Sequence, residues 1–272
     1  QDKKEQALRT YNGLIKERRF RAFEGDTRLL IGEYYQETRE LERAIEEYER
    51  VRDDFPQTDA SAMALYRTGL LYLQSRGDIE RAREYFKEVP QEKRNAEAVQ
   101  LGRDRLKDLD ARDRLIVKIR RADSTTTAKF VWKDEDAKKD TLVKSDTPQV
   151  HESLLELAEL YRAKLGQADS ASFYFREAIE RFPEDREVPR TLYALAWIEL
   201  ELNLDLEASR PHLEQLIEVY PFTEQANAAR QALGLGAVVS DEDKAQKQYA
   251  EIERLWLDPS EQTENYVPRL DS

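Results

Sequence analysis

The sequence contains no cysteine, which excludes disulfide bonds, cysteine-ligated zinc and thiol catalysis. The lack of cysteine does not decide the compartment, because many envelope proteins also lack it. Glycine and proline are scarce, with nine of each in 272 residues. No apolar run approaches the roughly 18 residues that a membrane-spanning helix needs. An apolar content of 40% is nevertheless enough to bury a substantial core.

Groups that carry catalysis are equally scarce. The two histidines, His151 and His212, lie far apart, and neither has a second histidine or a metal-spaced carboxylate beside it. Paired acids such as Glu46 and Glu47 point to different sides of a helix. The Gly-Leu-Gly at 234–236 lacks a third glycine and a preceding strand, so we interpret it as a helix C-cap. The sequence therefore predicts no enzyme, no cofactor and no metal site.

Charge is divided unequally along the chain. The net charge of −12 splits into +2 for residues 1–122, −1 for residues 123–148 and −13 for residues 149–272. The acidic second half argues against nucleic acid or an anionic membrane as its partner. The first half carries a basic cluster: Lys16, Arg18, Arg19, Arg21 and Arg28. A solvated helix face is the favoured interpretation, with a charged groove or head-to-tail packing as the alternatives.

A set of small and aromatic residues recurs along the chain with nearly constant spacing. The clearest copy, with steps of 3, 9, 4, 3 and 5 residues, is Gly32, Tyr35, Ala44, Tyr48, Val51 and Pro56. A second copy is Gly69, Tyr72, Ala82, Phe86 and Val89, and a third is Ala158, Tyr161, Ala171, Phe175, Ala178 and Pro183. Steps of 3 and 4 place residues on one helical face, and the longer step spans a turn. The pattern predicts stacked helix pairs in which small residues permit close approach.

At these residues the sequence resembles the tetratricopeptide repeat (TPR) family. A weaker fourth copy consists of Leu192, Leu195, Ala196, Ser209, Leu213, Leu216 and Pro221. The resemblance covers most of 1–90 and 150–257, although Arg28 stands where the family usually has a large apolar residue. It implies an all-α fold, a right-handed α-solenoid of antiparallel helix pairs.

Local signals predict where the helices begin and end. N-caps are expected at Asp78, Asp169, Thr223 and Thr147, the last followed by Pro148, with a capping box at Ser240 and Asp243. Second helices should end at the pairs Phe55-Pro56, Phe182-Pro183 and Tyr220-Pro221. Pro90 should end its helix early, and Pro211 is expected only in a first helical turn.

The chain is expected to divide into four segments. Residues 1–122 form an N-terminal array ending in a long helix, and 149–239 form a second array. Residues 240–272 supply a capping helix and a tail. Because the chain begins at Gln1, we expect a processed form or a fragment.

The segment between the arrays, 123–148, is expected to be a non-helical insert. Its residues 125–132 and 141–144 have strand propensity, so a small hairpin is one alternative. Its composition favours a flexible insert. Trp132 speaks for order there, because an exposed tryptophan often marks a docking element.

In the TPR family the first helices of successive pairs line a groove that holds peptides or partner segments. The resemblance places groove positions on four helices of this chain. They are Glu33, Gln36, Glu37, Tyr66, Leu70, Gln74, Leu155, Glu159, Arg162, Tyr193, Trp197 and Leu200. Tyr193 and Trp197 are four residues apart, so both can face one side as an aromatic platform, with inter-repeat core as the alternative.

The phrase Phe-Pro-x-Thr-x-Ala at 55–60, with Ala-Leu-Tyr-Arg-Thr-Gly-Leu-Leu-Tyr at 64–72, resembles repeats of bacterial envelope proteins. Repeats similar to it occur in the lipoprotein of the outer-membrane β-barrel assembly machine and in the periplasmic coordinator of the Tol-Pal system. The resemblance implies a non-catalytic scaffold in the periplasm or at the outer-membrane periphery, binding a protein partner or serving in a multi-subunit complex. The alternatives are a cytoplasmic regulatory sensor that binds a peptide or effector, and a structural spacer that self-associates.

Overall fold

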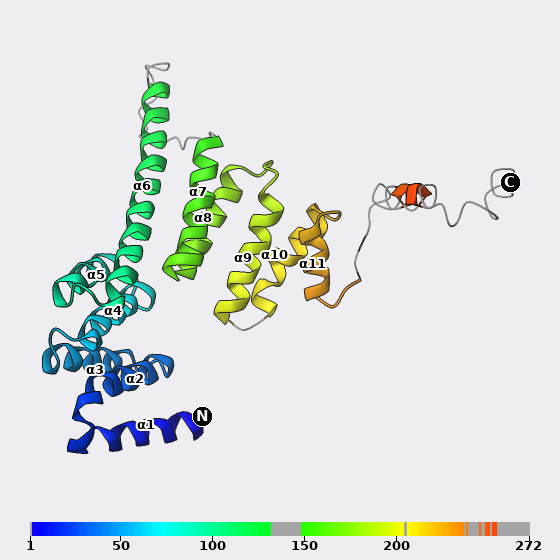
Figure 1. Ribbon diagram of the computed structural model, residues 1–272. Helices are drawn as coiled ribbons and strands as arrows, with labels where there is room; N and C mark the ends of the chain where they lie inside the picture. The colour runs from blue at the N-terminus through cyan, green and yellow to red at the C-terminus, as the bar shows by residue number, and fades with distance from the viewer. Residues whose placement is uncertain are drawn as a thin grey trace, which may run out of the picture. The chain divides into compact units, whose positions relative to one another are not determined.

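The computed structural model describes residues 2–131, 148–203, 206–236, 238, 245, 248–250 and 252–254. The chain forms two compact units, Gln1–Phe182 and Pro183–Ser272. Within the described residues every regular element is a helix, and consecutive helices pack against one another in pairs (Figure 1). The expected all-α fold of successive helix pairs is confirmed.

The first unit contains most of the helices. In chain order they are α1 (Asp2–Leu14), the 3₁₀ helix η1 (Arg18–Phe23), α2 (Glu24–Glu37), α3 (Leu41–Asp54), α4 (Asp59–Gln74), α5 (Ile79–Glu92), α6 (Glu97–Val131), α7 (Pro148–Leu160), the π-helix η2 (Tyr161–Leu165) and α8 (Ala168–Arg181). The second unit contains α9 (Val188–Asn203), α10 (Leu206–Val219) and α11 (Glu224–Ala232).

Each early helix pair closes around a glycine and an aromatic ring. Tyr48 of α3 lies against Gly32 of α2, so closely that a Cβ at Gly32 would overlap the ring. Phe86 of α5 lies against Gly69 of α4, where a Cβ would come within 2.6 Å of Phe86 Cε1. Both rings are fully buried. The small-aromatic pattern therefore marks the points of closest helix approach.

Arg28, which departs from the apolar pattern of the first copy, is held by two carboxylates. Its guanidinium lies 2.9 Å from Glu24 Oε1 and 3.0 Å from Glu47 Oε2, so it joins α2 to α3. Burial alone would lower the pKa of Arg28, but the hydrogen bonds to both carboxylates outweigh that effect and raise it. A partly buried cluster of one arginine and two glutamates thus takes the place of apolar packing.

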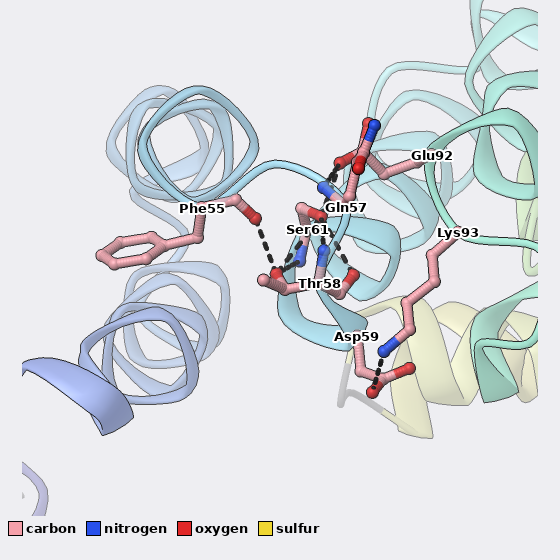
Figure 2. Close-up of polar contacts among 7 residues, drawn as sticks. All are labelled: Phe55, Gln57, Thr58, Asp59, Ser61, Glu92 and Lys93. Atoms are coloured by element: carbon pink, nitrogen blue, oxygen red, sulfur yellow. Dashed lines mark hydrogen bonds and ion pairs between the residues drawn. The ribbon is translucent and has the colours of Figure 1, made fainter.

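The turn between α3 and α4 is tied to the end of α5 (Figure 2). Thr58 Oγ1 accepts from the backbone N–H of Ser61, and Ser61 Oγ accepts from the backbone N–H of Thr58. Glu92 of α5 accepts from Ser61 Oγ at 2.7 Å and from the backbone N–H of Gln57. Gln57 has a φ of +63°, a conformation that the glutamate bond helps to hold. The carboxylate therefore fixes one repeat onto the next.

The helix-capping predictions are confirmed at two of the three positions that the structure tests. Asp78 accepts from the backbone N–H of Arg81, and Thr223 accepts from that of Ala226. Asp169 is not an N-cap, because α8 begins one residue earlier and its N-cap is Gln167. Asp169 instead lies in the first turn, where a negative charge favours the helix dipole.

The predicted helix ends are correct at the prolines that follow an aromatic residue and wrong at Pro90 and Pro211. Helices α3, α8 and α10 end directly before the Phe55-Pro56, Phe182-Pro183 and Tyr220-Pro221 pairs, as expected. Pro90 does not end its helix early, because α5 continues to Glu92. The Phe86 carbonyl, which Pro90 cannot satisfy, faces Gly102 of α6, where a Cβ would lie 3.3 Å from that oxygen. Pro211 is also inside α10, beyond its first turn.

Helix α6 overturns part of the predicted insert. It continues through Val131, so the non-helical insert expected from residue 123 is wrong as far as residue 131, and so is the alternative of a strand from residue 125. Strand propensity depends on context, and an established helix extends at little cost. Residues 132–147, including Trp132, the 141–144 strand and Thr147, lie outside the described residues. Pro148 begins α7, as expected for a proline in the first helical position. Ser240 and Asp243, the predicted capping box, also lie outside the described residues.

The first unit runs to Phe182, and three hydrogen bonds join the segment around η2 to earlier helices of this unit. Arg112 Nε of α6 donates to the Tyr161 hydroxyl at 2.8 Å. Arg105 of α6 donates to the Lys164 carbonyl, and Gln167 Nε2 donates to the carbonyl of Leu73 in α4. These bonds group α7 and α8 with the first helices.

We predict that Gly32→Ala lowers the free energy of unfolding by about 1–3 kcal/mol, since the new methyl group overlaps Tyr48. Gly13→Ala is the matched control, because Gly13 lies in α1 with no atom near its Cβ position. The control should be neutral or stabilising by up to about 1 kcal/mol. Urea unfolding followed by circular dichroism measures both. Equal effects would contradict the close-approach account.

Stability should also fall at alkaline pH. Burial raises the pKa of Tyr48 above its value in the unfolded chain, near 10. Neutral, buried Tyr48 therefore makes its full contribution to the free energy of unfolding below about pH 10. This contribution is lost as the pH rises above about 10, because the unfolded chain then gives up the tyrosine proton more readily than the folded chain. In wild type the free energy of unfolding should fall between about pH 10 and 11.5, the range in which tyrosines titrate. In Tyr48→Phe this fall should be smaller. Tyr249→Phe, at a ring that is 69% exposed, should leave it unchanged.

Candidate functional site

The predicted groove residues lie on the first helices of successive pairs. In the first unit they lie on α2, on α4 and on α7 with η2, and in the second unit on α9. Each set is described within its own unit.

On α2, all three predicted groove residues already have contacts within the chain. Glu33 forms an ion pair with Arg67 of α4. Gln36 Oε1 accepts from the Tyr48 hydroxyl at 3.4 Å, and Glu37 lies 2.6 Å from Lys4 of α1. A partner on this surface would meet residues whose positions are fixed in advance.

The pair of Glu33 and Arg67 spans α2 and α4. The Arg67 side chain is 26% exposed and that of Glu33 is 35% exposed. Burial lowers the pKa of Arg67, so desolvation opposes its positive charge, and the carboxylate of Glu33 is the counter-ion beside it. Arg67 was not predicted from the sequence. It could have been found from its position, because Arg67 follows Glu33 by 34 residues, which is about one repeat unit.

On α4, the predicted residues differ in exposure. Tyr66 is only 8% exposed, and its ring packs on Phe86 at 5.8 Å between centroids. Leu70 is half-buried, and Gln74 is exposed beside Gly166. Truncation of Tyr66 would therefore disturb the core, whereas Leu70 and Gln74 can be changed at the surface.

On α7 and η2, Leu155 is half-buried, while Glu159 and Arg162 form an ion pair at 2.8 Å one turn apart. Their side chains are 40% and 43% exposed. Such a surface pair contributes about 0–1 kcal/mol to stability. Glu159 and Arg162 could therefore give up their ion pair and contact a partner instead, with little loss of stability.

On α9, Tyr193 and Trp197 do lie on one side of the helix. Their rings meet edge to face, with centroids 6.1 Å apart. Trp197 is 44% exposed, while Tyr193 and Leu200 are half-buried. A supported, partly exposed tryptophan is the kind of side chain that anchors a partner.

Two further features bear on chemistry. Among the described residues no three His, Asp or Glu side chains are placed to share a metal ion. The same part of the chain has no helix long and apolar enough to cross a membrane.

Family models of the tetratricopeptide repeat match residues 29–103 and 152–185. Both segments are therefore similar to tetratricopeptide repeats. No curated protein is similar enough in sequence to count as a match.

Solved structures with some similarity include the following two. A candidate kinesin light chain of Podosopora anserina, with nearly identical TPR-like repeats, is 15% identical with a TM-score of 0.29, covering 85% of this chain and 94% of that one. BtubC (BKLC) from P. vanneervenii is 12% identical with a TM-score of 0.27, covering 94% and 89%. At these values neither likeness bears on function.

We predict that Glu33→Gln destabilises the first unit more than Glu37→Gln does. Loss of the Glu33 carboxylate leaves Arg67 partly desolvated without its counter-ion, which should cost about 1–3 kcal/mol. The pair of Glu37 and Lys4 is exposed, so its loss should cost at most about 1 kcal/mol. Chemical unfolding in parallel tests the difference, and equal costs would show that the α2–α4 pair is not structural.

Proposed function

We propose that this chain is a non-catalytic scaffold that holds a protein or peptide partner on the first helices of its repeats. The observation that carries the proposal is the Tyr193–Trp197 pair, an exposed aromatic platform on a first helix of a chain with tetratricopeptide repeats. Glu159 and Arg162 add charged groups on another first helix. Residues that make few contacts inside the chain but stay ordered are suited to binding.

The partner is proposed to belong to a multi-subunit assembly of the bacterial envelope. This part rests on the Phe-Pro-x-Thr-x-Ala phrase at 55–60, whose threonine caps α4. The acidic half of the chain supports a protein partner over a nucleic acid or an anionic membrane.

The test is affinity capture from envelope and cytosolic fractions, with mass spectrometry of the retained proteins. We expect one dominant envelope protein, and we expect Trp197→Ala to reduce its capture at least tenfold, as loss of an interface anchor does. Helical content should be unchanged, because Trp197 is already 44% exposed.

Phe173→Ala is the matched control. Phe173 is 59% exposed but lies on α8, a second helix, so its loss should leave capture intact. Equal capture by wild type and Trp197→Ala would contradict the proposal that the partner binds to the first helices through Trp197. A partner retained only from the cytosolic fraction would refute the envelope location and favour a regulatory sensor.

A further inference from the structure

The segment between α1 and α2 exposes one large aromatic side chain. It contains the six-residue 3₁₀ helix η1, in which no residue is buried. Phe23, its last residue, is 63% exposed. Runs of 3₁₀ helix this long are uncommon. A single exposed ring is common on protein surfaces, so Phe23 counts as part of a binding surface only together with the charges beside it.

The same segment carries positive charge without partners. Lys16, Arg18 and Arg21 are exposed, and none of them has an ion pair within the described residues. Arg19 differs, because it donates to Glu17 at 2.7 Å and stacks on the Phe20 ring at 4.7 Å. Residues 16–23, the basic-aromatic segment, therefore combine three unpaired cations with an exposed phenylalanine.

The second unit has a surface of the opposite kind. At the turn between α10 and α11, Val219 is 56% exposed and Phe222 is 62% exposed. Glu218 and Glu224 flank them, are exposed and have no ion pair in the described part of the chain. Residues 218–224, the acidic-apolar turn, thus present two apolar side chains between two unpaired carboxylates.

Hydrogen bonds hold the acidic-apolar turn in shape. Thr223 Oγ1 caps α11 by accepting from Ala226, 3.1 Å away, and Arg230 donates to the Pro221 carbonyl at 2.9 Å. The Tyr220 hydroxyl donates to the Pro183 carbonyl at 3.4 Å. A surface fixed in advance loses little entropy on binding.

We propose that the basic-aromatic segment of one copy of this chain binds the acidic-apolar turn of a second copy. Each surface supplies exposed apolar side chains for burial, and unpaired charges of opposite sign surround them. A nucleic acid or an anionic membrane fits less well, since the whole chain carries a charge of −12. The contact joins two different surfaces, so it is heterologous and builds rings or open chains of subunits.

Analytical ultracentrifugation of the whole chain tests the contact. At low salt the average mass should rise with protein concentration. At about 1 M salt, where the Debye length is about 3 Å, the chain should be mostly monomeric. A monomer at every concentration and salt would overturn the proposal.

Charge reversal identifies the surfaces. Arg18→Glu with Arg21→Glu, and separately Glu218→Arg with Glu224→Arg, should each weaken self-association by about tenfold or more. Mixing the two variants should restore assembly, because the reversed segment of one matches the reversed turn of the other. Arg103→Glu with Arg114→Glu, at two exposed positions of α6, is the control and should assemble normally.

Two results would contradict this assignment. Self-association that both reversals leave unchanged would place the contact elsewhere. A chain that stays monomeric but binds vesicles containing phosphatidylserine, and loses that binding with Arg18→Glu and Arg21→Glu, would assign the segment to a membrane instead. Both outcomes are independent of partner capture through Trp197.

Discussion

The close approach of paired helices at a glycine is the constraint on which the rest of this structure depends. Gly32 admits the ring of Tyr48, and Gly69 admits the ring of Phe86. With the rings in these places, each pair has a dry interior, and the first helix turns its remaining face outward. Helix pairs of this kind supply outward-facing side chains at regular intervals.

Successive pairs are joined by charges that recur with the repeat. Glu42 pairs with Arg76, and Asp59 with Lys93 at 2.5 Å, both across 34 residues. Glu33 and Arg67 have the same separation. An acid in one repeat thus meets a base in the next, and this register can be found in the sequence once the repeat is known. The pairs Glu42–Arg76 and Asp59–Lys93 are more exposed than Glu33–Arg67 and contribute little energy, so we infer that these two set alignment more than stability.

The helix pairs and most of their ends could be predicted from the sequence, because both depend on local patterns. The spacing of small and aromatic residues predicts the pairs, and the Phe-Pro and Tyr-Pro pairs predict the helix ends. Tertiary contacts decided the rest. Pro90 stays within its helix since Gly102 leaves room for the freed carbonyl of Phe86. Tyr66, predicted as a groove residue, is buried because Phe86 tilts against it. The position and exposure of Trp197 agree with its predicted role, which only a partner can test.

We propose that a partner occupies the first helices of the pairs. Hydrogen–deuterium exchange of the chain, with and without its captured partner, tests this most directly. The account predicts added protection on α2, α4, α7 and α9, at or beside the predicted residues. Protection confined to the second helices α3, α5, α8 and α10 would contradict it.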